Sequence, residues 1–138
     1  MNLKLIKMNP YIICLLALLF AFFQNPSKCF GFEISIDVAP NTLNLQSEGS
    51  VVTVHTDIAY DDVDVSTVYL NGIAIKSWKA DNRGNFVAKF SMEDVKKLDG
   101  LKIDGYNMLK IVGLTKNVQS FWGQKEIKVV DNIPQGGR

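Results

Sequence analysis

Residues 65–75 read Val-Ser-Thr-Val-Tyr-Leu-Asn-Gly-Ile-Ala-Ile, and this stretch decides the fold class. Two short runs rich in β-branched residues flank the pair Asn71-Gly72. Both positions of such a pair tolerate positive φ, which a two-residue hairpin turn requires. The stretch therefore predicts two antiparallel strands joined by a tight turn, each presenting alternate side chains to opposite faces.

The same alternation extends outward from this hairpin. Apolar and polar residues alternate over 34–38 and 52–58, as in half-buried antiparallel strands. Further strands are expected at 65–70, 73–78, 86–90, 106–114 and 121–130. Such a series of short strands separated by turn signals predicts an all-β, two-sheet antiparallel sandwich. A small barrel is the structural alternative, whereas a parallel α/β fold is disfavoured because long helical crossovers are missing.

One segment departs from the strand pattern. Residues 91–98 read Ser-Met-Glu-Asp-Val-Lys-Lys-Leu, and Val95 and Leu98 fall on one side of a helix. Ser91 is placed to cap it, with Asp94 three residues on as a weaker form of the capping box. A helix of two turns is not stable alone, so it is expected to lie against the sheets.

The N-terminal residues 1–31 are typical of a secretory signal peptide. Lys4 and Lys7 precede a 13-residue apolar run at 11–23, which is too short to span a bilayer. Cleavage is expected after Cys29 or Gly31. An uncleaved N-terminal anchor and a lipoprotein with lipid on Cys29 are the alternatives. Residues 32–131 then form the sandwich domain, and residues 132–138, which lack the strand pattern, form a flexible tail.

Composition and charge narrow the function classes. The chain has 138 residues and a net charge of +1, without the basic excess of a nucleic-acid binder. Removal of the leader leaves 12 basic and 14 acidic residues, a net charge of −2, and no cysteine. An exported domain without disulfides must be stabilised by its hydrophobic core. The expected location is extracytoplasmic, either secreted or periplasmic.

Three stretches together resemble the immunoglobulin-like β-sandwich modules of secreted and cell-surface proteins of bacteria and archaea. They are residues 36–49 with 52–54, residues 62–72, and residues 104–113 with 121–123 and 127–129. The resemblance implies an immunoglobulin-like sandwich with one short helix after the signal segment. Its motifs specify turns and core positions and bring no catalytic residue. Tyr106, just before an apolar strand, is placed for a tyrosine corner, with an ordinary half-buried tyrosine as the alternative.

Three aromatic residues are the candidate binding residues: Trp78, Trp122 and Tyr69. If they point outward together, they form a platform for sugar rings or for a partner protein. If a bulge turns either tryptophan inward, that residue belongs to the core instead.

Other candidates carry less chemistry. His55, the single histidine, is expected to face solvent without a triad partner or a second metal ligand. The acidic residues Asp57, Asp61, Asp62 and Asp64 suit either a solvated loop or a calcium site, and a glycosidase pair would need an enclosing cleft. The loop at 81–85, Asp-Asn-Arg-Gly-Asn, has too few carboxylates for calcium.

The sequence therefore predicts a non-catalytic exported module with a structural, scaffolding or adhesive role. The alternative is a module that binds carbohydrate or an envelope polymer through surface aromatic residues, and a small hydrolase built on the acidic residues is a third hypothesis. The expected partner is another extracytoplasmic protein or a polysaccharide, and no nucleic acid. No catalytic or metal-binding residues are expected in the chain, and no cofactor apart from the calcium alternative. Contact with a membrane is expected only through an uncleaved N-terminal segment.

Overall fold

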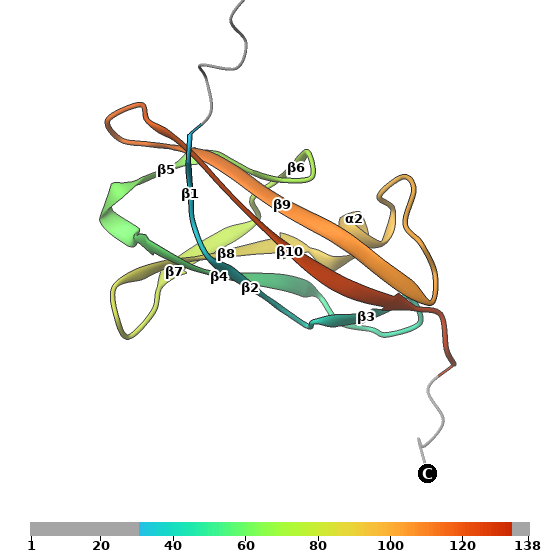
Figure 1. The fold of residues 1–138 in the computed structure, drawn as a ribbon. Coiled ribbons are helices and arrows are strands. Elements are labelled where there is room, and N and C mark those ends of the chain that lie inside the picture. The colour runs from blue at the N-terminus through green and yellow to red at the C-terminus, as the bar shows by residue number, and fades with distance from the viewer. Residues whose placement is uncertain (1–30, 134–138) are drawn as a thin grey trace, which may run out of the picture. The chain divides into compact units, whose positions relative to one another are not determined.

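The chain folds into two β-sheets that enclose one hydrophobic core (Figure 1). The structure, a computed structural model, describes residues 31–133. Sheet A has the strand order β1-β10-β9-β5-β6, with β3 also paired to β10, and sheet B has the order β2-β4-β8-β7. The all-β, two-sheet prediction is confirmed, and the sheets are separate rather than closed into a barrel.

The strands of sheet A are β1 (Phe32–Glu33), β3 (Thr42–Asn44), β5 (Val63–Leu70), β6 (Ile73–Ala74), β9 (Gly105–Thr115) and β10 (Ser120–Val130). Those of sheet B are β2 (Ile36–Ala39), β4 (Val51–Ala59), β7 (Ser77–Ala80) and β8 (Asn85–Ser91). A 3-10 turn, η2 (Tyr60–Asp62), joins β4 to β5, and a short helix, α2 (Met92–Lys96), follows β8.

The first segment of the domain changes sheets twice. β1 runs parallel to β10 in sheet A, β2 crosses to pair with β4 in sheet B, and β3 returns to run parallel to β10. The crossing passes close to Gly123 of β10, where an added Cβ would lie 2.8 Å from the Ile34 carbonyl oxygen. Glycine is therefore required at this point by the close approach of the two backbones.

The core is built from the inward residues of both sheets. Its largest fully buried side chains are Phe86 and Phe90 from sheet B and Phe121 from sheet A, followed by leucines and isoleucines such as Leu109 and Ile111. The alternation of buried and exposed residues along β2 and β4 follows the sequence pattern at 34–38 and 52–58. Burial of these apolar side chains is the main stabilising term, since the described chain contains no cysteine.

The Asn71-Gly72 turn is confirmed, and the strand predicted after it is not. Both turn residues have positive φ, 46° and 83°, and the turn joins β5 to β6. The stretch 73–78 was predicted as one strand, but β6 ends at Ala74 in sheet A and β7 begins at Ser77 in sheet B. The first half of this segment pairs within sheet A and the second half within sheet B. The alternation of apolar and polar residues does not indicate which sheet a strand joins.

Helix α2 begins where Ser91 caps it, as predicted. The Ser91 hydroxyl accepts a hydrogen bond from the Asp94 backbone N–H at 3.4 Å. Met92 and Val95 are buried against the sheets, which stabilises a helix too short to persist alone.

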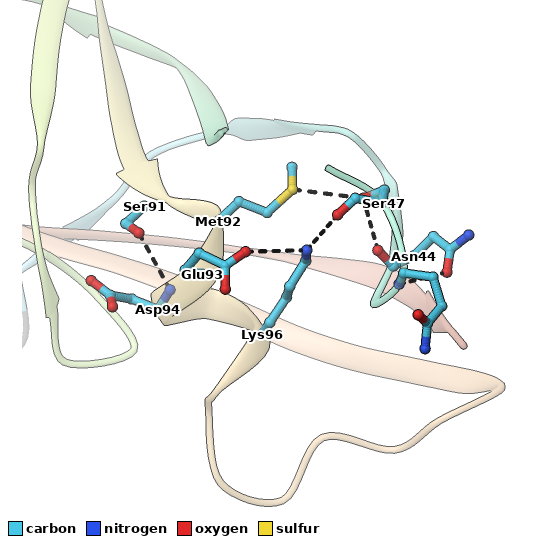
Figure 2. A network of polar contacts seen from close by, with 8 residues as sticks. Asn44, Ser47, Ser91, Met92, Glu93, Asp94 and Lys96 are labelled. Atoms are coloured by element: carbon cyan, nitrogen blue, oxygen red, sulfur yellow. Dashed lines mark hydrogen bonds and ion pairs between the residues drawn. The ribbon is translucent and has the colours of Figure 1, made fainter. Parts of the chain in front are cut away.

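Lys96 connects this helix to the loop after β3 (Figure 2). Its ammonium group donates a 2.6 Å hydrogen bond to the Ser47 carbonyl oxygen and lies 3.4 Å from the Glu93 carboxylate. The Ser47 hydroxyl in turn donates to the Asn44 carbonyl oxygen at 2.8 Å. Of these contacts, the hydrogen bond from Lys96 to Ser47 joins α2 to the loop.

The predicted signal peptide at 1–31 lies almost wholly outside the described residues, as does most of the predicted tail. Within residues 31–133, no helix is long and apolar enough to span a bilayer.

Candidate functional site

The outer surface of sheet A carries an exposed apolar patch, which we call the sheet A face. Its members project away from the core, from β5, β9 and β10. They are Tyr69 (41% exposed), Tyr106 (64%), Met108 (44%), Val112 (38%) and the half-buried Trp122. Contiguous exposed apolar side chains of this kind mark interaction surfaces more often than isolated ones do.

Strand register explains why these residues form one patch. Val112 of β9 lies directly opposite Trp122 of β10 on one side and opposite Tyr69 of β5 on the other. Met108 and Tyr106 continue along β9 on the same face, because every second residue of a strand points the same way. The patch therefore combines a row across three strands with a line along the central one.

Three charged residues lie inside the patch: Lys110, Glu126 and Lys128, the last of which lies opposite Tyr106 at one end. Lys110 is on β9 between Met108 and Val112, and its Nζ lies 5.1 Å from the centroid of the Trp122 ring. Glu126 lies opposite Met108 on β10. The cation–π contact holds the Lys110 ammonium group over the aromatic surface instead of leaving it free in solvent.

The structure brings together two of the three predicted binding residues. Tyr69 and Trp122 share the row through Val112, whereas Trp78 is on β7 of sheet B. Trp78 lies opposite Ala88, a core residue, so its side chain points toward the space between the sheets. It remains 43% exposed because β7 is an edge strand.

Sequence reasoning missed Met108, Val112 and the outward role of Tyr106. Tyr106 was predicted to close a tyrosine corner, but it points outward, and none of the hydrogen bonds found within residues 31–133 involves its hydroxyl group. The sequence did contain an indication of this apolar surface. Along 106–114 apolar residues occur at both the even and the odd positions, whereas a strand with one solvent-facing side is expected to have them at only one of the two.

A shallow hollow of about 420 Å³, lined mainly by polar and charged residues, lies over sheet B. His55, Asp37, Asp57, Asp81 and Arg83 contribute to its lining. His55 is exposed, as the alternation predicts. The mixed charges make this a well-hydrated surface rather than an enclosed site.

The Asp81 carboxylate is already used by its own loop. It accepts hydrogen bonds from the backbone N–H groups of Arg83 at 2.7 Å and Asn85 at 2.9 Å. The hydrogen bond from Asn85 lowers the pKa of Asp81 below the usual 3.8, with smaller contributions from Arg83 and His55. The residues 81–85 therefore form a self-capped turn.

The acidic residues near η2 are not arranged around one point. Asp57, Asp61 and Asp62 contribute with Glu33 to a second hollow of about 620 Å³, while Asp64 instead accepts hydrogen bonds from Ser66. In the part of the chain that the structure describes, no three acidic, histidine or cysteine side chains are grouped closely enough to hold a metal ion.

Comparison with known proteins found no matching family, no similar characterised protein and no similar solved structure for this chain. The sheet A face is therefore the candidate functional site on the grounds of its own geometry.

Proposed function

We propose that this chain is a non-catalytic, extracytoplasmic β-sandwich module of immunoglobulin-like type that acts by docking through its sheet A face. The role is adhesive or scaffolding: the module holds a partner in place and performs no reaction on it. One observation carries the proposal. Tyr69, Val112 and Trp122 form an apolar row across three strands, with Tyr69 and Val112 exposed and Trp122 half-buried, on the outside of a sheet whose inner side already supplies the core.

The strand order supports the immunoglobulin-like part of the proposal. In immunoglobulin constant-type sandwiches, the first, second, fifth and fourth strands form one sheet and the third, sixth and seventh form the other. The order β2-β4-β8-β7 against β5-β9-β10 corresponds to this arrangement, with β6 as an addition beside β5.

The N-terminal pattern supports export. The positive Lys4 and Lys7, the short apolar run and the small residues near 29–31 are the parts of a cleavable leader. N-terminal sequencing of the protein recovered outside the cytoplasm tests this: we expect it to begin at Phe30 or Phe32. Recovery only in the membrane fraction with Met1 retained would contradict it.

Site-specific photocrosslinking tests the docking surface. A photoreactive phenylalanine derivative replaces Met108 on the sheet A face, and in a matched variant it replaces Lys79, which is exposed on β7 of sheet B. In the cells that produce the protein, we expect covalent adducts of defined mass from position 108 and none from position 79. Equal yields at both positions, or none at 108, would remove the proposal.

Carbohydrate binding is the second candidate, favoured by Tyr69 and Trp122 lying in one cross-strand row. Against it, the Lys110 ammonium group already occupies a face of the Trp122 ring, which a stacking sugar would need. A Trp78→Phe variant leaves Trp122 as the only tryptophan of the chain. Its fluorescence, titrated with a panel of cell-wall and plant polysaccharides, should change saturably if this candidate holds, and flat curves exclude it.

A further inference from the structure

We propose that the partner that docks on the sheet A face is a second copy of this chain, so that the protein forms a symmetric dimer. The inference rests on the proposed function and deepens it by naming the partner. It is argued from the placement of opposite charges within the apolar patch, and from the size of the surface that the patch offers.

A two-fold symmetric contact uses the same patch on both copies, so the patch must be complementary to itself. Charged groups that the axis brings together must then have opposite signs. The sheet A face satisfies this condition at its centre. Lys110 lies opposite Gln124, and Glu126 lies opposite Met108, one step of two residues further along the same strands.

Lys110 and Glu126 are therefore diagonal neighbours on one face, at a separation of about 7–8 Å between such positions. Two copies that meet face to face are related by a two-fold axis that lies in the plane of their contact. If this axis passes midway between Lys110 and Glu126, at right angles to the line that joins them, it brings Lys110 of each copy to Glu126 of the other. Two ion pairs form at once. Met108 lies close to this axis, so the two methionine side chains meet each other between the charges.

Both charged groups are available for such pairing. Among residues 31–133, the ion pairs are Lys96–Glu93 and Lys125–Asp37, neither of which uses Lys110 or Glu126. Lys110 rests over Trp122, and this cation–π contact leaves its N–H groups free to reach a carboxylate above the sheet. The contact also restricts the long side chain before it binds, which reduces the entropy lost on pairing.

The size of the patch sets the expected affinity. Strands β9 and β10 have 11 residues each, which corresponds to a length of about 35 Å. Strands β9 and β10, spaced by about 4.8 Å, give a width of about 10 Å over this length, and β5 adds a third strand only beside residues 111–115 of β9, hence a face of about 400 Å². Two such faces bury about 800 Å², the size of a weak, transient contact. A reversible dimer with a dissociation constant in the micromolar range is expected.

Charge reversal in sedimentation velocity runs tests the pairing. The protein, expressed from the full chain and purified in the form that the cells export, is run from about 1 to about 300 μM to cover that range. Lys110→Glu and Glu126→Lys each place like charges together twice per dimer, so each should weaken dimerisation at least about tenfold. The double variant restores opposite charges and should return the dissociation constant to within about threefold of the original.

Lys79→Glu is the matched control, because it reverses an exposed charge on the other sheet and should leave dimerisation unchanged. Thermal melting of every variant verifies that the sandwich remains folded, as expected for exposed positions. A monomer throughout the concentration range, a single reversal without effect, or a double variant as weak as the singles would overturn the inference.

The outcomes separate this inference from the proposed function. A monomeric protein whose position 108 crosslinks to a different protein would overturn the second-copy inference and leave docking through the sheet A face intact. A dimer unaffected by Lys110→Glu, together with no crosslinking at position 108, would overturn both. A dimer that follows the charge pattern and crosslinks to itself at 108 supports both.

Discussion

The outer faces of the two sheets each carry a valine on a central strand, and the two valines differ in how much of the side chain is exposed to solvent. On sheet A, Val112 of β9 is 38% exposed between Trp122 and Tyr69. On sheet B, Val87 of β8 is fully buried although it is not part of the core cluster. Its cross-strand neighbours are His55 and Lys79, whose longer polar side chains flank it.

This difference separates a face whose apolar side chain is covered within the domain from a face whose apolar side chains are left uncovered. A polar side chain can cover an apolar neighbour with its aliphatic or ring atoms while its polar end stays in water, and sheet B uses this device. The sheet A face leaves much of its apolar surface in water, and that exposed surface gives the isolated domain no hydrophobic stabilisation. An exposed patch without a stabilising role is best explained by contact with another molecule, as proposed above.

The largest expected effect comes from placing a carboxylate at each valine. Val87→Asp buries an unpaired charge and should lower the free energy of unfolding by at least about 3 kcal/mol. Val112→Asp places the charge in solvent and should change it by less than about 1 kcal/mol. Urea denaturation followed by tryptophan fluorescence measures both.

If Val87→Asp does not fold, Val87→Ala provides a measurable substitute, with an expected loss of about 1–2 kcal/mol against less than about 0.5 kcal/mol for Val112→Ala. Equal losses at the two positions would show that the faces do not differ in burial.

A smaller effect is expected from the self-capped turn beside sheet B. Asp81→Asn replaces the carboxylate that accepts the two backbone hydrogen bonds with a neutral amide. Because hydrogen bonds to a charged acceptor are the stronger ones, the substitution should lower the melting temperature. Because the pKa of Asp81 is lowered on folding, its carboxylate stabilises the native state above pH 3.8, and this contribution is lost as the pH falls through the lowered value.

Thermal melts of wild type and Asp81→Asn as a function of pH measure this contribution. Their difference in melting temperature should stay constant from about pH 7 to about pH 5 and shrink toward zero in more acidic buffer. A difference that grows on acidification would contradict the assigned role of the carboxylate.

The cation–π contact between Lys110 and Trp122 should make a modest contribution to the free energy of unfolding. Lys110→Ala is expected to cost about 0.5–1 kcal/mol through loss of the Trp122 contact, whereas Lys97→Ala, at an exposed position after α2, should be close to neutral. In the Trp78→Phe background, the emission of Trp122 should change with Lys110→Ala and stay unchanged with Lys97→Ala. An unchanged emission spectrum in both would argue that Lys110 does not rest on the ring. Both melts are made at a concentration below dimerisation.

The smallest effect belongs to the ion pair that joins the two sheets. Lys125 of β10 lies 3.4 Å from Asp37 of β2, and both side chains are largely exposed. Asp37→Asn should cost less than about 1 kcal/mol and have no measurable effect at about 1 M salt, because exposed pairs are weak and screened. A cost that persists at high salt would show that Asp37 has a structural role beyond its charge.

Local chemistry accounts for the elements that could be predicted. The Asn71-Gly72 turn needs only two residues that accept positive φ, and the start of α2 needs only the Ser91 hydroxyl near the Asp94 N–H. The stretch 73–78 failed as a single strand because its halves pair with different sheets. Tyr106 failed as a corner residue because alternation alone does not say which of two apolar sets faces the core.

What the sequence by itself determined is most of the longer strands, the Asn71-Gly72 turn and the Ser91 cap, and the presence of apolar side chains on both sides of the segment 106–114. Only the tertiary structure decided that Tyr69, Val112 and Trp122 meet in one row while Trp78 belongs to the other sheet. The physical reason is that strand alternation acts over two residues, whereas register and sheet membership arise from pairing between segments far apart in the chain.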